Sequence, residues 1–257
     1  MNVIHAFILG IVEGLTEFLP VSSTAHLILA SKLMHLPQTE FQTFFEIFIQ
    51  SGAILAIVFL YFEYVLKHKD LWAKFVVSFI PTAVVGLILE KIIKKFFFNS
   101  TPLILGSMFV IGVIFIVFEY FIKKDRIKIS KSIKDMTYKE AFFIGVGQSL
   151  AVIPGVSRSG IVMLTMMGIN FRRDESAVYS FLLGVPTILA ASGFEVLKTN
   201  FGILTDPNNL LLLAVGFVMS FITAVLSVKW FVGFLKKNTL VPFGIYRIIL
   251  SVFFFVV

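Results

Sequence analysis

The stretch GIVEGLTEFLPVSSTAH, residues 10–26, interrupts an otherwise apolar segment that covers residues 3–34. Pro20, followed by Ser22 and Ser23, breaks the segment in the middle, and each half is too short to cross a hydrocarbon core of about 30 Å. A broken apolar segment can enter a membrane and return, provided that protein or a wet cavity satisfies its exposed backbone groups. We therefore expect residues 3–34 to form a re-entrant helix–turn–helix hairpin.

A second stretch, GVGQSLAVIPGVSRSG at residues 145–160, matches the first at an offset of 135 residues. It lies in the apolar segment 141–169, which is broken around Pro154 and Ser157, so a second re-entrant hairpin is predicted there. Each hairpin is followed by three long apolar windows. Because an odd number of spans inverts the second copy, we expect an inverted repeat whose hairpins enter from opposite faces and meet near the midplane.

These long apolar windows predict six transmembrane helices. They cover residues 43–66, 75–90, 102–122, 175–197, 209–232 and 239–257. The predicted fold is an all-α polytopic membrane protein, a single membrane domain 1–257 with six transmembrane helices plus two hairpins in an inverted 3+3 repeat. The first repeat is 1–122, a basic cytoplasmic linker covers 123–139, and the second repeat is 140–257.

The composition indicates that the bilayer is the main solvent. The 257 residues are 58% hydrophobic and only 14% charged, with 31 Phe, which is unusual for a water-soluble protein. The chain has no Cys, so a disulfide framework, a thiolate metal site and a cysteine nucleophile are excluded. The net charge of +7 does not predict a nucleic-acid partner, because Lys and Arg lie between apolar segments, as anchors facing anionic membrane lipid do.

The basic residues also predict an orientation. If the linker 123–139 is cytoplasmic, fifteen Lys and Arg lie on its side and five lie opposite, while Arg158 and Arg247 fall within apolar segments. The five opposite residues are Lys32, Lys91, Lys94, Lys95 and Lys198. This asymmetry predicts that both termini are on the outer face.

The first hairpin carries an acidic pair followed by hydroxyls and an imidazole. Glu13 and Glu17 are four residues apart, which places both carboxylates on one face of a helix. The residues after the break are Ser22, Ser23, Thr24 and His26. Burying such a cluster in an apolar segment is costly, so the cluster indicates a functional site. Taken singly, each residue could equally be a helix cap or a turn residue.

The second hairpin predicts an anion-binding turn. Ser157, Ser159 and Gly160 can present hydroxyl and backbone N–H donors at a helix start, and Arg158 has a planar guanidinium that matches phosphate oxygens. An ion pair between Arg158 and a glutamate of the other hairpin is the alternative. Carboxylates, hydroxyls and an imidazole opposite an arginine suit phosphoryl transfer on a lipid phosphate.

The two stretches resemble the signature segments of the bacterial undecaprenyl-diphosphate phosphatases, also called bacitracin-resistance proteins. The resemblance covers nearly the whole chain and extends to Phe45-Glu46 with Gln50, to Met136-Thr-Tyr138 and to the segment from Pro242 to Arg247. It implies an enzyme of the bacterial cytoplasmic membrane, open to the outer face, that hydrolyses undecaprenyl diphosphate to the monophosphate and inorganic phosphate. Such an enzyme recycles the lipid carrier of cell-wall synthesis and confers bacitracin resistance.

The resemblance also implies roles for individual residues and a divalent cation, Mg²⁺ or Ca²⁺. The catalytic candidates are Glu13, Glu17, Ser23, His26 and Arg158. The substrate-binding candidates are Ser22, Thr24, Ser157, Ser159, Gly160, Gln50 and Arg247. The candidate metal ligands are Glu13, Glu17 and Glu46. One departure is Val162, where the family usually has Thr, so one hydroxyl contact to phosphate is expected to be missing.

Three of these candidates have clear alternatives. Glu46 and Gln50 lie one turn apart in the first long span, where an interhelical hydrogen bond is as plausible as a role at the site. Arg247 is either a second phosphate-binding residue or a side chain that extends to the outer interface.

The predicted mechanism places the diphosphate on Arg158 and the surrounding N–H groups, while Glu13 and Glu17 bind a cation or orient the nucleophile. Ser23 or a water attacks, and His26 is the general acid or base. The sequence leaves both nucleophiles open. The expected partners are a polyprenyl diphosphate lipid and membrane lipid, without nucleic acid, and a homodimer is left open.

Two rival functions follow from the same features. A lipid flippase or secondary transporter is the main one, because inverted repeats with broken helices also build transporters. An acid-phosphatase-like enzyme with a His nucleophile is disfavoured, because no second His lies near Arg158.

Overall fold

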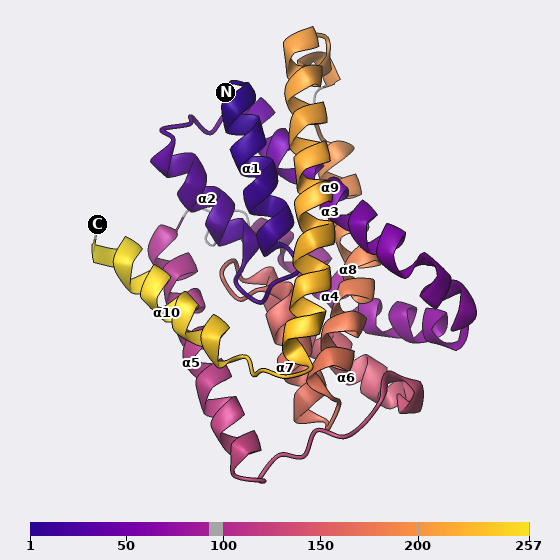
Figure 1. The fold of residues 1–257 in the computed structure, drawn as a ribbon. Helices are drawn as coiled ribbons and strands as arrows, with labels where there is room; N and C mark the ends of the chain where they lie inside the picture. Colours follow the sequence, from indigo (N-terminus) through magenta and orange to yellow (C-terminus); the bar gives the residue numbers. More distant parts are fainter. Residues whose placement is uncertain (93–99, 200, 257) are drawn as a thin grey trace.

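The computed structural model describes residues 1–92, 100–199 and 201–256, and within these ranges the chain folds into ten α-helices (Figure 1). The helices are α1 (Val3–Thr16), α2 (Ser23–Leu33), α3 (Glu40–Lys67), α4 (Asp70–Ile92), α5 (Thr101–Lys123), α6 (Tyr138–Gln148), α7 (Arg158–Gly168), α8 (Arg173–Val196), α9 (Pro207–Leu235) and α10 (Val241–Val256). The short 3₁₀ turns are η2 (Ile133–Asp135), η3 (Ser149–Val152) and η4 (Phe201–Leu204). The predicted all-α class is confirmed. Lys94 and Lys95, expected on the outer side, lie outside the described residues.

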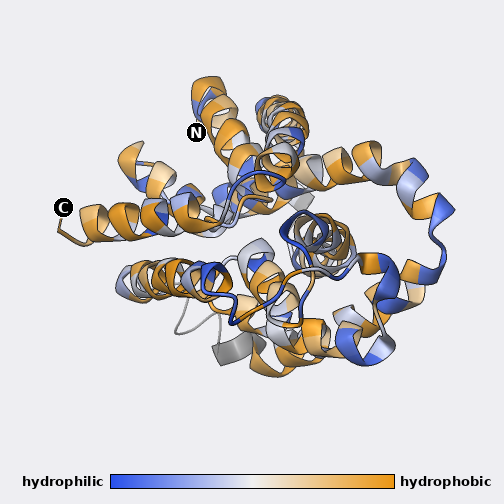
Figure 2. Ribbon diagram, turned by 60° about the horizontal axis from the view of Figure 1, so that its bottom comes forward, coloured by the Kyte–Doolittle hydropathy of each residue, from blue (hydrophilic) through white to orange (hydrophobic). Residues whose placement is uncertain are grey.

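Five of the described helices are long and apolar enough to cross a membrane, namely α3, α4, α5, α8 and α9. The first five predicted windows coincide with them: four lie inside the helix, and the window 175–197 extends one residue past the end of α8. Their outer surfaces are apolar: Phe59 and Leu87 are each 65% exposed, and hydrophobic colouring covers most of the helices in Figure 2, with hydrophilic residues mainly at their ends and connections. Lipid accommodates such surfaces and water does not, so the chain is a multi-pass membrane protein.

The sixth predicted span, 239–257, is shorter than expected. Helix α10 has 16 residues, which rise about 24 Å, less than the roughly 30 Å of a hydrocarbon core. It begins at Val241, and the N–H of Leu240, directly before it, donates to the buried Glu119 carboxylate at 2.9 Å. Helix α10 is therefore an apolar helix that is shorter than the five long ones.

Both broken segments form a pair of short helices. Residues 3–34 fold into α1 and α2, and residues 141–169 lie in α6, η3 and α7. The residue before the second helix of each pair, Ser22 or Ser157, has a φ of 74°, in a region that residues other than glycine seldom adopt. These two serines are 135 positions apart, so the same unusual turn occurs at matching positions of the two hairpins.

Small residues bring the hairpin helices close to the long spans. Gly14 of α1 faces α9, where an added Cβ would lie 2.1 Å from Oγ1 of Thr223. Gly112 of α5 and Gly244 of α10 face each other, and a Cβ on either one would lie within 2.8 Å of the other's carbonyl oxygen. Small residues permit such close helix contacts within membranes. These contacts hold α1 against α9 and α10 against α5, and Figure 1 shows both pairs side by side.

The basic linker 123–139 packs against the helices that follow it. Ile133 is 1% exposed and Met136 is 4% exposed, and both belong to an apolar cluster beneath α6 and α8. The Ser132 hydroxyl and the Ile133 N–H donate to the Glu175 carboxylate at 3.1 and 3.2 Å. These apolar and polar contacts fasten the linker to the start of α8.

Candidate functional site

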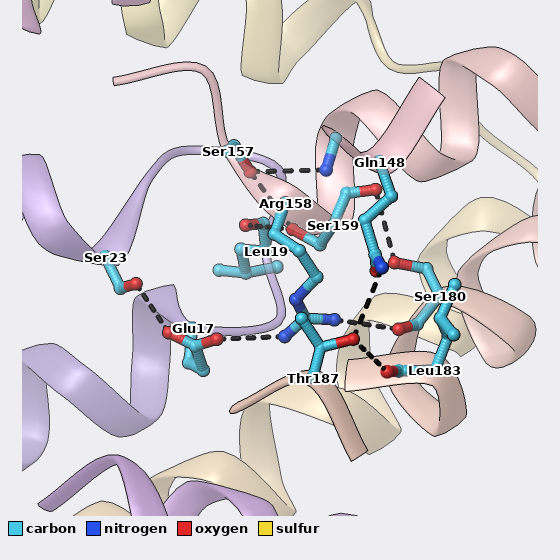
Figure 3. A network of polar contacts seen from close by, with 11 residues as sticks. Glu17, Leu19, Ser23, Gln148, Ser157, Arg158, Ser159, Ser180, Leu183 and Thr187 are labelled. Carbon is cyan, nitrogen blue, oxygen red and sulfur yellow. Dashed lines mark hydrogen bonds and ion pairs between the residues drawn. The ribbon is translucent and has the colours of Figure 1, made fainter. Parts of the chain in front are cut away.

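The two hairpins meet at an ion pair between Glu17 and Arg158 (Figure 3). Glu17 directly follows α1, and Arg158 is the first residue of α7. Nη2 of Arg158 lies 2.9 Å from Oε1 of Glu17, and the two side chains are only 11% and 9% exposed. The structure therefore brings the acidic turn and the guanidinium turn together, and does so through the ion pair that was the alternative to phosphate binding.

Helix α8 supports the Arg158 guanidinium from the other side. Nη1 donates to the Ser180 carbonyl at 2.7 Å, and the guanidinium lies 5.7 Å from the centre of the Phe18 ring. A Cβ on Gly184 would lie 2.4 Å from Nη1, so this glycine provides the space that the guanidinium occupies. The Nε atom is buried and has no hydrogen-bond partner within the described residues, so its N–H is an unpaired donor.

Ser23 belongs to the same network. Its hydroxyl donates to Oε2 of Glu17 at 2.5 Å, while Oε1 of Glu17 accepts from Arg158. One carboxylate thus bridges a hydroxyl and a guanidinium that come from opposite hairpins, as Figure 3 shows. A carboxylate within hydrogen-bond reach of a hydroxyl is an arrangement that can remove its proton during nucleophilic attack.

Glu13 lies one helical turn before Glu17 and is fully buried. Neither of its carboxylate oxygens receives a hydrogen bond from a donor within the described residues, although Glu17, Glu46 and Arg158 are close enough to interact with it electrostatically. Leaving a buried polar group unpaired carries a free-energy cost, so such a group calls for a partner. A cation or a proton would satisfy it.

Glu46 is already hydrogen-bonded within its own helix and to α2. Its Oε1 accepts from the Ser31 hydroxyl at 2.9 Å and from the Gln42 amide at 2.8 Å. The structure thus contains the interhelical hydrogen bond that was the alternative to a metal contact. Gln50 follows one turn later on α3 and is half-buried. Within the described ranges no three His, Asp or Glu side chains are grouped so that they could hold a metal ion.

His26 contacts α10 rather than Glu17 or Ser23. Its Nδ1 lies 2.7 Å from the Ser22 carbonyl oxygen and its Nε2 lies 2.7 Å from the Tyr246 hydroxyl, with the two rings stacked 5.6 Å apart. A carbonyl oxygen only accepts, so Nδ1 is the donor, and in the neutral ring Nε2 accepts from Tyr246. Tyr246 is a residue of the site that sequence reasoning overlooked.

The remaining candidates of the second turn build the hairpin itself. The Ser157 hydroxyl accepts from the Gly160 N–H at 3.2 Å and caps α7. The Ser159 hydroxyl donates to the Leu19 carbonyl at 3.0 Å and so joins the two hairpins directly. In the first turn, Thr24 is half-buried at the start of α2. The hydroxyl and N–H groups of the second turn therefore form hydrogen bonds mainly with other groups of the protein.

The last two predicted positions lie deep in the protein. Arg247 is 0% exposed, so the alternative that it extends to the outer interface is wrong; its guanidinium contacts backbone carbonyls. Val162, where a Thr was expected, is also 0% exposed and packs in an apolar cluster that includes Ile144 and Leu183.

Comparison with known proteins gives matches over almost the entire chain. A sequence model described as "Bacitracin resistance protein BacA" matches residues 6–253. An undecaprenyl-diphosphatase of Persephonella marina is 49% identical over 257 residues, covering 99% of this chain and 98% of the relative. One from Wolinella succinogenes is 46% identical over 257 residues, covering 99% and 97%. One from Aquifex aeolicus is 40% identical over 247 residues, covering 96% and 95%. The matched region contains both hairpins.

Proposed function

The chain belongs to the bacitracin resistance protein BacA family, and we propose on that premise that it is a membrane undecaprenyl-diphosphatase. It hydrolyses undecaprenyl diphosphate to undecaprenyl phosphate and inorganic phosphate, and thereby contributes to bacitracin resistance. One observation carries the assignment of the site: Glu17 links the Ser23 hydroxyl to the Arg158 guanidinium between two hairpins of an apolar protein.

The proposed reaction uses this network directly. Arg158 binds the terminal phosphate through its unpaired Nε–H and stabilises the charge that develops on the phosphate oxygens. Glu17 accepts the proton of the attacking hydroxyl, which belongs to Ser23 or to a water beside it. The new P–O bond forms at the terminal phosphorus as the bond to the bridging oxygen breaks, and undecaprenyl phosphate leaves. If Ser23 attacks, a water then hydrolyses the phosphoserine and releases inorganic phosphate; if water attacks, inorganic phosphate forms directly. His26, held by Tyr246, is the general acid or base.

A divalent cation, Mg²⁺ or Ca²⁺, is part of the proposal. The unpaired carboxylate of Glu13 beside Glu17 supplies hard oxygen ligands of the kind that both ions prefer. Two protein carboxylates suffice for Mg²⁺ when substrate phosphates complete its coordination, which is consistent with the absence of a three-residue cluster within the described ranges. When bound, the cation would neutralise part of the charge of the diphosphate.

The proposed architecture is an inverted repeat of residues 1–122 and 140–257, each starting with a re-entrant hairpin. Support comes from the shared φ of Ser22 and Ser157 and from the reciprocal contact of Gly112 with Gly244. The proposed location is the bacterial cytoplasmic membrane, with both termini and the site opening on the outer face. In Figure 1 the connection between α5 and α6 lies at the bottom, whereas both termini lie in the upper half, as this orientation requires.

The experiment is phosphate release from undecaprenyl diphosphate by purified protein with Mg²⁺ or Ca²⁺. Wild-type protein should release phosphate, and Glu17→Gln and Arg158→Ala should each abolish turnover while the protein stays folded in detergent. Glu63→Gln is the matched control, because Glu63 pairs with Lys67 and its side chain is 83% exposed. If wild-type protein releases no phosphate, a lipid transporter becomes the better assignment.

A further inference from the structure

Arg247 of α10 is the largest fully buried side chain in the described chain. Its guanidinium donates to four backbone carbonyls: Nε to Met108 at 3.2 Å, Nη1 to Pro20 at 3.0 Å, and Nη2 to Val156 at 3.2 Å and to Gly155. Among the described residues no carboxylate pairs with it. These carbonyls belong to three separate segments of the chain. The buried guanidinium therefore connects the three segments through hydrogen bonds to their backbones.

Two of the four carbonyls occupy matching positions in the hairpins. Pro20 and Gly155 are 135 residues apart, which is the offset of the sequence match. Each precedes by two residues the serine with positive φ, Ser22 or Ser157. One guanidinium therefore holds both turns at the same point of each, directly before the helices that begin with Ser23 and Arg158.

The other side of Arg247 rests on the matching helix of the first repeat. Gly112 and Gly244 are 132 residues apart, and the same offset relates Arg247 to Phe115. The guanidinium lies 5.6 Å from the centre of the Phe115 ring. The two halves thus differ at this position, with a cation in one and an aromatic ring in the other, and the pair fills the space between the hairpins.

We propose that Arg247 is a positioning residue that sets the separation of the two hairpin turns, and through it the contact of Glu17 with Arg158, rather than a residue that binds phosphate. This inference rests on the proposed phosphatase function. Removing the guanidinium would take a hydrogen-bond donor from four buried carbonyls, three of which lie in the turns outside any helix. Lysine keeps the charge but lacks the planar arrangement of five N–H groups, so it cannot make all four contacts in the same directions.

The absence of cysteine permits a distance measurement between the hairpins. Leu33 at the end of α2 is 65% exposed and Leu150 in η3 is 52% exposed, so Leu33→Cys and Leu150→Cys would carry a pair of spin labels without disturbing the core. In this labelled protein Arg247→Lys should shift or broaden the distance distribution. The same substitution in the unlabelled protein should lower kcat at least tenfold and leave KM within about threefold. The matched control is Arg126→Lys on the exposed linker. It should change neither the distance distribution nor the kinetic constants.

An unchanged distance distribution in Arg247→Lys would overturn the proposal, and a raised KM at normal kcat would instead assign Arg247 to substrate binding. If Arg247→Lys does not fold, the proposal is tested on wild-type protein instead. The protein is treated with phenylglyoxal, which modifies accessible arginines, and the modified residues are identified by peptide mapping. Native Arg247 should stay unmodified with or without inorganic phosphate. Modification that inorganic phosphate prevents would overturn the proposal. The distances do not depend on turnover, so failure of the phosphatase assay remains distinguishable.

Discussion

A Cβ atom on Gly184 would lie 2.4 Å from Nη1 of Arg158, so close that the guanidinium would have to move. The same helix offers the Ser180 carbonyl, which accepts from Nη1 at 2.7 Å. Helix α8 therefore both leaves room for the guanidinium and anchors it. The position of Arg158 relative to Glu17 depends on a glycine that carries no chemistry of its own.

Gly184→Ala should reduce phosphate release roughly 100-fold, because misplacing a reacting group by about 1 Å has an effect of that size. The melting temperature in detergent should stay close to that of the wild type. Gly193→Ala is the control on the same helix, since nothing lies within 4 Å of a Cβ there. Wild-type turnover in Gly184→Ala would show that the tight placement of Arg158 is irrelevant to the reaction.

The local arrangement of each hairpin could be predicted from the sequence. Pro20 and Pro154 break apolar segments, and the segments around them match each other, which was sufficient to place an acidic turn opposite a guanidinium turn. The long spans were equally predictable, because runs of apolar residues report directly on membrane-crossing length. The contact of Leu240, directly before α10, with Glu119, 121 residues earlier, was not predictable.

Contacts between distant helices could not be predicted in the same way. Tyr246 reaches His26 across 220 positions, and Arg247 reaches Pro20 across 227. Hydrophobic periodicity tells which face of a helix is apolar, but in a membrane both lipid and protein are apolar neighbours, so the pattern does not tell which helices meet. Gly184 gave only a weak signal, as a glycine within an apolar helix.

Glu13→Gln should weaken the response to the divalent cation. The substitution keeps the shape of the side chain but removes the charge of a carboxylate that has no hydrogen-bond donor among the described residues, so a cation loses one hard ligand. We expect the Mg²⁺ or Ca²⁺ concentration for half-maximal phosphate release to rise at least tenfold, roughly 1.4 kcal/mol of cation binding.

Two controls accompany this titration. Removal of the cation by a chelator should abolish turnover of the wild type, and addition of the cation should restore it. Glu63→Gln, on an exposed part of α3, should titrate as the wild type does. An unaltered cation titration in Glu13→Gln would exclude Glu13 as a ligand.

Glu140, at the start of α6, should make the stability of the protein depend on pH. Partial burial raises the pKa of its carboxyl group, but hydrogen bonds from Lys131 and from the N–H and hydroxyl of Thr137 lower it, and the net pKa lies below its ordinary value of 4.5. The folded state therefore binds this proton more weakly than the unfolded state. Its contribution to stability is complete above the unfolded pKa and is lost as the pH falls through the folded pKa.

The measurement is the melting temperature in detergent between about pH 6 and about pH 3. The wild type should lose stability more steeply over this range than Glu140→Gln, which cannot titrate at this position. Glu63→Gln should keep the wild-type slope, because its ion pair is exposed and exposed pairs contribute little. Equal slopes for the wild type and Glu140→Gln would contradict the assignment.

Ser23→Ala separates the two nucleophiles. If Ser23 attacks, an enzyme-bound phosphoserine forms and then hydrolyses, so the alanine variant should lose at least about 1000-fold in kcat, as removal of a covalent nucleophile does. Mass analysis of rapidly quenched wild type should then find a phosphate on Ser23, and Ser159→Ala should still form this intermediate. The geometry favours this route, because the Ser23 hydroxyl already donates to Glu17 at 2.5 Å. Ser23→Ala with more than about a tenth of wild-type turnover would instead indicate that a water attacks and that Ser23 only orients it.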